Sequence, residues 1–322
     1  MLLNTLYIII GIVLVLWGAD RLTEGASALA RRMKVPEIVI GLTIVAAGTS
    51  APELFVSMVS ALKGTPDMAV GNVVGSNIFN TLLIVGCSAV VAPMVIAKST
   101  VRKDMPFAVA ASVLLLIVIL TNNDISRIEG LFLLAGFAGF MVYTFRVAMN
   151  AGDRTNTVEN TTTNPVSIWK NCFYVLGGLG GLIFGSNLFV DSASEVARQL
   201  NISEGVIGLT IVAGGTSLPE LATSVVAARK GQSAMAIGNV IGSNVFNVLL
   251  ILGVTATISP MQIEGITTVD LTVMLLSVLL VWGFSYTKYT VARWEGVLLV
   301  LAFFIYMGWL LYSLPDLKPV SV

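Results

Sequence analysis

The sequence predicts an all-α polytopic membrane protein, with ten transmembrane helices arranged as two inverted five-helix repeats. Of its 322 residues, 56% are hydrophobic and 11% are charged, and the mean hydropathy is +0.91. A soluble domain is about half apolar and about a quarter charged. Long apolar runs recur along the whole chain, and two sequence motifs occur twice at the same separation. These observations together predict a duplicated membrane domain.

The ten spans follow from runs of about 20 apolar residues, which is the length that crosses a bilayer as a helix. The first run begins MLLNTLYIII and lacks the basic region and cleavage site of a secretory signal, so we expect it to remain as the first span. The most polar interruption predicts a cytoplasmic linker at residues 151–168, between a first repeat at 1–150 and a second at 169–322. The predicted spans lie near residues 5–30, 38–62, 67–92, 104–121, 127–149, 169–199, 205–229, 234–259, 267–286 and 292–313.

The second and third spans share their motifs with the seventh and eighth. GLTIVAAGTSAPEL at 41–54 returns as GLTIVAGGTSLPEL at 208–221 with 12 of 14 positions identical. GNVVGSNIFN at 71–80 returns as GNVIGSNVFN at 238–247, again 167 residues later. The other six spans are predicted by length and hydropathy alone. Internal repetition at one offset therefore covers most of the chain, with motif regions at 41–80 and 208–247.

The positive charges predict opposite orientations for the two repeats. The odd-numbered connections hold 13 Lys and Arg residues, whereas the even connections and the C-terminal tail hold four. By the positive-inside rule the odd connections are cytoplasmic, and both termini lie on the outer side of the cell (inner) membrane. Charges also switch between aligned positions, as from Arg32 to Gln199 and from Lys34 to Asn201. A parallel duplication with a missed span, the open alternative, would keep the cations at matching positions.

Composition also limits the classes of function. A net charge of zero gives no basic surface for nucleic acid, and the absence of histidine removes the commonest metal ligand and the usual proton relay. Cys87 and Cys172 have no spacing partner, so neither a thiolate metal site nor a disulfide is indicated. We expect no cofactor and no obligate protein partner, and the lipid bilayer is the expected surroundings.

Two glutamates are the leading functional candidates. Glu53 and Glu220 fall about halfway along the second and seventh spans, where a carboxylate costs about 2.5–3.5 kcal/mol on insertion scales. Helix-breaking residues precede each of them, with Pro52 in one copy and Pro219 in the other. Proline frees backbone oxygens one turn back, and such backbone survives at membrane depth only where protein or a cavity satisfies it.

Neutral oxygen donors surround both glutamates in the sequence. Carboxylates, hydroxyls and carbonyls are hard ligands that suit Ca²⁺ or Na⁺. Four short helical segments that carry these ligands, arranged around a pseudo-two-fold axis, would enclose a cation. Inverted repeats with a site at the middle of the membrane are the architecture of secondary transporters. The candidate side chains are Thr49 and Ser50 beside Glu53, Thr216 and Ser217 beside Glu220, Ser76 with Asn80 at i, i+4, and Ser243 with Asn247 at i, i+4.

Structural explanations stand beside these functional ones. Serine and threonine in membrane helices often bond to the preceding turn, and small residues four apart favour close helix packing. The remaining motif asparagines, Asn72, Asn77, Asn239 and Asn244, would then tie helices together. Asp20 and Glu24, near the end of the first span, are expected to be structural groups or to lie at a cavity edge.

The segments GTSAPE and GTSLPE and the two GNVxGSNxFN blocks resemble the paired α-repeats of sodium/calcium exchangers, within the cation/Ca²⁺ exchanger superfamily. In lacking a large insert between its halves, the chain resembles a prokaryotic member. The resemblance implies that Glu53 and Glu220 bind Ca²⁺ with Thr49 and Thr216. It also implies Na⁺ ligands, and Asn247 stands where some relatives, including potassium-dependent ones, carry aspartate. The implied Na⁺ ligands are the glutamates with Ser50, Ser76, Ser217, Ser243, Asn80 and the carbonyls of Ala46 and Ala213.

The resulting prediction is an antiporter, and not an enzyme, that exchanges Na⁺ for Ca²⁺ by alternating access. In the inferred mechanism the first and sixth spans slide across the filled site, with Gly11, Gly18, Gly178, Gly181 and Gly185 offering a smooth surface. A Ca²⁺/H⁺ antiporter and a K⁺-dependent Na⁺/Ca²⁺ exchanger are the nearest alternatives. A remote one is an intramembrane hydrolase in which Glu53 and Glu220 form an acid–base pair.

Overall fold

The protein is a bundle of membrane-length helices. The computed structural model describes residues 2–154, 168–200, 211 and 213–313, and among these eight helices are long and apolar enough to cross a membrane. A ninth span is a pair of helical stretches, Glu37–Thr49 and Ala51–Leu62, bent by 45°. The predicted span at 205–229 and the linker at 151–168 fall partly outside the described residues. The total of ten therefore stays a prediction.

The first half of the chain reproduces the predicted spans closely; for example, the span expected at 5–30 is the helix Leu2–Met33. In chain order the first half comprises α1 (Leu2–Met33), α2 (Glu37–Ile40), η1 (Gly41–Val45), α3 (Ala46–Thr49), α4 (Ala51–Leu62), α5 (Pro66–Ile78), η2 (Phe79–Ile84), α6 (Val85–Val91), β1 (Met94–Val95), η3 (Thr100–Asp104), α7 (Met105–Asn122), β2 (Asp124–Ile125) and α8 (Arg127–Arg154).

The second half follows the same pattern, and the span expected at 234–259 runs without a break over Ser233–Ile258. Its elements are α9 (Ile168–Gln199), α11 (Ala213–Thr216), α12 (Leu218–Arg229), α13 (Ser233–Val245), η6 (Phe246–Ile251), α14 (Leu252–Ile258), β3 (Met261–Gln262), α15 (Thr268–Tyr286), β4 (Thr290–Val291) and α16 (Arg293–Ser313).

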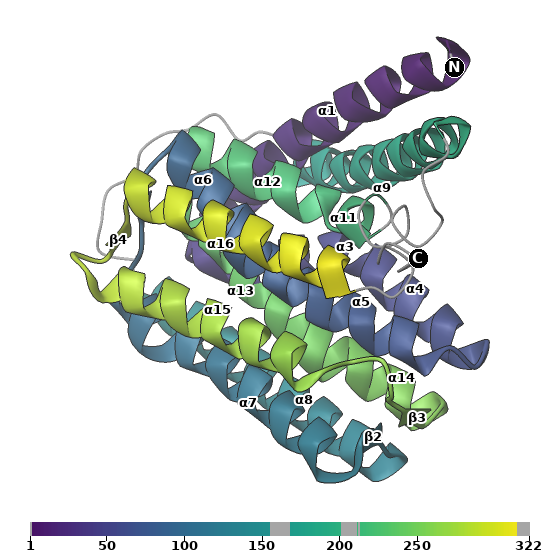
Figure 1. Ribbon diagram of the computed structural model, residues 1–322. Coiled ribbons are helices and arrows are strands. Elements are labelled where there is room, and N and C mark those ends of the chain that lie inside the picture. Colours follow the sequence, from purple (N-terminus) through teal and green to yellow (C-terminus); the bar gives the residue numbers. More distant parts are fainter. Residues whose placement is uncertain (1, 155–167, 201–210, 212, 314–322) are drawn as a thin grey trace, which may run out of the picture.

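The two spans that carry the GNVxGSN motifs form the centre of the bundle. In their most apolar windows 72% of the residues of α5–α6 and 78% of those of α13–α14 are buried, against 22% for α1. Figure 1 shows α5 and α13 in the middle of the molecule, with α1 and α9 side by side at its edge. Polar side chains on the central helices are therefore shielded from lipid on most sides.

Both central spans change their helical pitch at the same place. The segments η2 and η6 are π-helical and start at Phe79 and Phe246, so each follows a GSN triplet. A π-helical turn is rare and frequent at functional sites. The sequence predicted plain α-helix here, because no residue preference distinguishes a π turn from an α turn.

Two short antiparallel bridges depart from the all-helical expectation. β1 pairs with β4, and β2 pairs with β3. A proline precedes each of β1 and β3, so the foregoing helix ends and the extended chain needs new hydrogen-bond partners. Each bridge joins a connection of the first half to one of the second.

The glycines predicted to form a sliding surface have a different role. A Cβ at Gly18 would lie 2.7 Å from the Gly178 carbonyl oxygen, and one at Gly11 would lie 2.8 Å from the Gly185 carbonyl oxygen. Gly181 faces Trp17 and Gly18 in the same interface. These glycines join α1 to α9 at backbone distance, so the sliding-surface expectation is wrong for them. The packing explanation holds, because only glycine allows two helices to approach this closely.

Gly18→Ala should therefore destabilise the protein. The new methyl group would meet backbone atoms of α9, which cannot rotate away as a side chain can, and overpacking of this kind costs about 1–3 kcal/mol. Gly177→Ala is the matched control, because a Cβ at Gly177 meets no heavy atom within 4 Å. Thermal unfolding in detergent should show a lower melting temperature for Gly18→Ala only, and equal melting temperatures would contradict this packing.

Candidate ion-binding site

Each glutamate stands in the first turn of a helix that begins immediately after a break. Ser50 separates α3 from α4, Ser217 separates α11 from α12, and both have non-helical backbone angles, with ψ of 7° and 6°. Proline occupies the second position of α4 and α12, where its missing N–H costs nothing. Glu53 and Glu220 thus lie at the positive ends of two helix dipoles, which favour the ionised carboxylates.

The two halves exchange hydrogen bonds through these serines. The Ser50 hydroxyl donates to Glu220 Oε1 over 3.0 Å, and the Ser217 hydroxyl donates to Glu53 Oε1 over 3.1 Å. Both glutamates are 1% exposed, and each accepts a hydrogen bond from the serine at the helix break of the other half. The structure therefore brings together the two carboxylates that the sequence placed 167 residues apart.

Among the residues that the structure describes, four oxygens at this centre have no hydrogen-bond partner. Glu53 Oε2, Glu220 Oε2, Asn80 Oδ1 and Asn247 Oδ1 are all buried and unpaired. Within the described part of the chain, no Lys or Arg forms a salt bridge with either glutamate. Burial of an unpaired carboxylate oxygen is costly, so a positively charged group from outside the chain would relieve the cost.

The amide nitrogens of Asn80 and Asn247 are engaged, whereas their amide oxygens have no partner among the described residues. Asn80 Nδ2 donates to Asn244 Oδ1 over 3.2 Å, and Asn247 Nδ2 donates to Asn77 Oδ1 over 3.1 Å. These bonds fix the orientation of each amide and leave its oxygen available as a ligand. The η2 segment with Asn80 packs against α12, and η6 with Asn247 packs against α4, so each asparagine lies beside the glutamate-bearing helix of the other half.

The remaining motif asparagines hold the broken helices in place. Asn72 Nδ2 donates to the Glu53 carbonyl oxygen over 3.2 Å and to Ser57 over 2.9 Å. Asn239 Nδ2 repeats both bonds in the other half, to the Glu220 carbonyl at 3.4 Å and to Ser224 at 2.9 Å. The helix-tying explanation is therefore right for these residues and for the partners of Asn80 and Asn247.

The predicted hydroxyl donors are less uniform. Ser76 Oγ lies 3.2 Å from Ser217 Oγ, and Ser243 donates to Glu220 Oε1 over 3.5 Å, so Ser76 and Ser243 both join the carboxylate network. Thr49 Oγ1 lies 3.1 Å from the Val45 carbonyl oxygen and 3.2 Å from Asn239 Oδ1. Thr216 ends α11 and is partly buried.

The carbonyls of Ala46 and Ala213 stay predicted ligands, and the Ala46 oxygen also accepts a backbone hydrogen bond. The Ala46 carbonyl is not freed by Pro52, because it accepts the Ser50 N–H over 2.9 Å. Proline at position 52 instead frees the carbonyl four residues earlier, and the corresponding oxygen in the other half, that of Gly215, accepts a hydroxyl hydrogen bond from Ser186 on α9. No pattern in the sequence indicated this role for Ser186. Ala213 begins α11, and its side chain lies outside the described residues.

The donor set at this centre consists of oxygen atoms: two carboxylates, two amide carbonyls and several hydroxyls. Hard cations such as Ca²⁺ and Na⁺ prefer such ligands, whereas borderline and soft metals favour imidazole and thiolate. The family model described as "Sodium/calcium exchanger protein" matches residues 3–146 and 170–312. The chain belongs to the sodium/calcium exchanger family.

Relatives with curated descriptions agree with this assignment to the exchanger family. The chain is 38% identical to a protein of Alkalimonas amylolytica named as an antiporter, CaxA, over 97% of this chain and all of that one. It is 36% identical to the inner membrane protein YrbG of Escherichia coli, over 98% of this chain and 99% of that one. Members of the exchanger family are transporters, so this membrane protein is a cation transporter by class.

Its fold is also that of a solved exchanger. The sodium–calcium exchanger NCX_Mj, in crystals soaked without Na⁺ and Ca²⁺, superposes with a TM-score of 0.83 at 30% sequence identity. The match covers 96% of this chain and 99% of NCX_Mj. Sequence and fold therefore both support membership of the exchanger family and cation exchange.

Proposed function

We propose that the chain exchanges Na⁺ for Ca²⁺ across the membrane, with Glu53 and Glu220 forming one shared cation site. The supporting observation is the set of four buried, unpaired oxygens, two of them on carboxylates from opposite halves of the chain. One Ca²⁺ balances two carboxylates, and so do several Na⁺ ions. Because these ions need the same oxygens, occupancy by Na⁺ excludes Ca²⁺, which is the basis of exchange.

The proposed ligands are those that the resemblance implied. Glu53, Glu220, Thr49 and Thr216 bind Ca²⁺, and the glutamates bind Na⁺ with the motif serines and Asn80. The crossed serine-to-glutamate bonds and the unpaired amide oxygens support this assignment. The motif serines are Ser50, Ser76, Ser217 and Ser243, and the carbonyls of Ala46 and Ala213 complete the proposed Na⁺ ligands. Asn247 is a further, uncharged candidate ligand of the same cation site.

Alternating access through two inverted repeats completes the proposal. Several contacts recur with partners exchanged at the 167-residue offset: Ser50 with Glu220 and Ser217 with Glu53, and likewise for the asparagine pairs. Exchanged partners of this kind support a two-fold relation between the halves. With the cation distribution they favour repeats at 1–150 and 169–322, an inner-membrane location, and both termini outside.

The test is competition between the two ions. Isothermal titration of the purified protein with Ca²⁺, repeated at rising Na⁺, should show an apparent Ca²⁺ affinity that falls steeply as Na⁺ rises. Proteoliposomes should take up ⁴⁵Ca²⁺ only when a Na⁺ gradient is imposed. Uptake driven by a pH gradient in Na⁺-free vesicles would favour Ca²⁺/H⁺ exchange, and a requirement for K⁺ would favour the potassium-dependent class.

A further inference from the structure

A salt bridge connects α1 to the end of α12. The Lys230 ammonium lies 2.7 Å from Asp20 Oδ1, where Lys230 caps the C-terminus of α12 and Asp20 lies on α1. The same ammonium donates to the Asp20 carbonyl oxygen and to Thr23 Oγ1, each over 2.9 Å. Its three protons therefore all have partners on one helix, so the contact is specific in geometry and not merely electrostatic.

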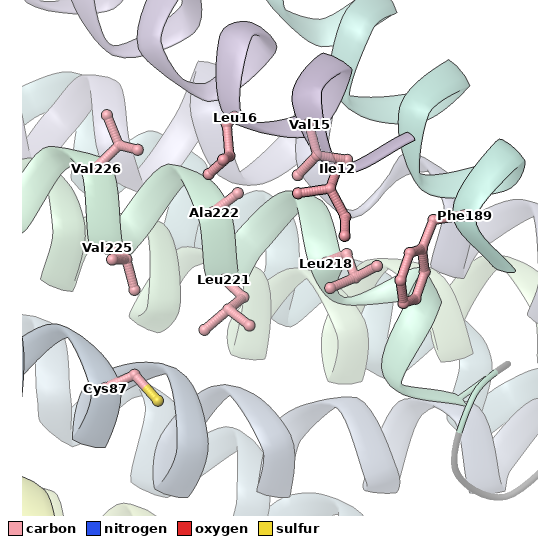
Figure 2. A pocket seen from close by; sticks show the side chains of 10 residues that line it. All are labelled: Ile12, Val15, Leu16, Cys87, Phe189, Leu218, Leu221, Ala222, Val225 and Val226. Carbon is pink, nitrogen blue, oxygen red and sulfur yellow. The ribbon is translucent and has the colours of Figure 1, made fainter. Parts of the chain in front are cut away.

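The boundary that this salt bridge crosses also carries an apolar pocket. The pocket has a volume of about 340 Å³ and is lined by Ile12 and Leu16 on α1, by Leu218, Leu221 and Val225 on α12, and by Cys87 and Phe189. Figure 2 shows Ile12 and Leu16 pointing from α1 toward α12, whereas Leu221 and Val225 point to the Cys87 side of α12. By contrast, α1 and α9 touch at backbone distance through their glycines. Helices α1 and α9 therefore form one unit, and the α1–α12 boundary is where this unit meets the helix that carries Glu220.

In the part of the chain that the structure describes, the other half has no equivalent salt bridge. At the 167-residue offset Lys230 corresponds to Lys63, which likewise caps the end of its helix, α4. Asp20 corresponds to Asn187 on α9, which is exposed and carries no charge. Among the described residues Lys63 forms no salt bridge. A second state in which the two halves exchanged their arrangements would therefore lack this salt bridge.

We propose that Asp20 and Lys230 form a one-sided latch, which holds the α1–α9 unit against α12 and closes the boundary on the Lys230 face. The inference rests on the proposed exchange function. Asp20 and Lys230 are then positioning residues for transport, because they hold α1 in place and touch no ion. Because only one half carries the latch, it biases the protein toward the described state. Breaking it shifts the population toward the state that opens to the Lys230 face.

The decisive variants exchange the residues between the halves. Asp20→Asn copies the uncharged second half, and Asn187→Asp gives Lys63 a partner. Right-side-out and inside-out vesicles then report the apparent Ca²⁺ affinity on each face. Asp20→Asn and Lys230→Gln should raise the affinity on the Lys230 face and lower it on the other. The ratio of the apparent Ca²⁺ affinities on the two faces should change about two- to five-fold, which is the size of effect expected for a partly exposed ion pair. Asn187→Asp should change the ratio in the opposite sense.

Two controls separate the latch from general damage. Glu24→Gln removes a neighbouring charge that contacts Arg21 and not Lys230, and it should leave the ratio unchanged. Lys63→Gln should have no effect alone, but it should cancel the effect of Asn187→Asp. Equal affinity ratios in wild type, Asp20→Asn and Lys230→Gln would overturn the proposal. So would a loss of affinity on both faces together with a lower melting temperature, since that pattern means a structural role.

A readout that needs no transport distinguishes the latch from the function on which it rests. Spin labels at the exposed positions Leu6 on α1 and Leu62 on α4 report how far the α1–α9 unit has moved, in protein without ions. Asp20→Asn should add or enlarge a second distance population, and Glu24→Gln should not. If exchange fails but this population shift appears, the proposed function is wrong and the latch stands; an unchanged distribution contradicts the latch.

Discussion

Glu53→Gln and Glu220→Gln should each abolish Na⁺-driven Ca²⁺ uptake, with a loss of at least about 100-fold. Either change halves the negative charge available to a divalent cation in a buried site where, among the described residues, no Lys or Arg forms a salt bridge with either glutamate. A loss of about 3 kcal/mol of binding free energy gives a factor of this size, and truncating one partner of a buried charge pair costs 2–5 kcal/mol or more.

Binding and transport should fail together in these variants. Wild-type protein at 100 times the dissociation constant of Ca²⁺ should be stabilised by about 2.7 kcal/mol, visible as a higher melting temperature. The glutamine variants should show no such shift. Glu295→Gln is the matched control, since Glu295 is also buried near a membrane-helix end but accepts a hydrogen bond from the Ala292 N–H. It should lose stability and keep the Ca²⁺ response; a normal Ca²⁺ shift in Glu53→Gln would refute the shared site.

Asn247→Asp should make the protein depend on a bound cation for its stability. The amide nitrogen of Asn247 donates to Asn77 Oδ1, and a carboxylate cannot replace that bond. The variant would add a third negative charge to a centre that already holds two, facing an acceptor oxygen. An uncompensated buried charge costs about 3–5 kcal/mol, so the cation-free variant should unfold at a much lower temperature.

Calcium should rescue Asn247→Asp more than it stabilises the wild type, because the third carboxylate adds attraction for the ion. Melting temperatures measured in EDTA and in excess Ca²⁺ would show this as a larger difference for the variant. Asn247→Ala removes the same hydrogen bond without adding charge, and its Ca²⁺ shift should not exceed that of the wild type. If both variants respond alike to Ca²⁺, Asn247 does not face the cation site.

Local pattern predicted much of the fold and of the site. Apolar runs of membrane length located the described spans to within a few residues, as for α13–α14, because a bilayer fixes both the length and the polarity of a helix. Glu53 and Glu220 were recognisable because a carboxylate amid apolar residues is costly without a purpose. The pairing of these residues across the chain was predicted only through the repetition of their motifs.

Other features had no signal in a linear pattern. The π-helical turns at Phe79 and Phe246 follow from packing around the centre, and the β bridges follow from which connections meet at the bundle ends. The role of the α1 glycines was assigned to the wrong interface, because small residues show that a close contact exists but not with which helix. Ser186, which satisfies the Gly215 carbonyl, lies on α9 outside both repeated motifs, and nothing in the linear order pairs it with that carbonyl.

The sequence by itself determined that this chain is a membrane protein with a duplicated pair of acidic, oxygen-rich motifs, because hydropathy, spacing and repetition are properties of the linear order. Only the tertiary structure decided which oxygens remain unpaired, which amide nitrogens are engaged, and which lysine finds a carboxylate. Those outcomes depend on helix packing between residues more than 160 positions apart, and a side chain's partner across such a distance is fixed by geometry and not by its neighbours in sequence.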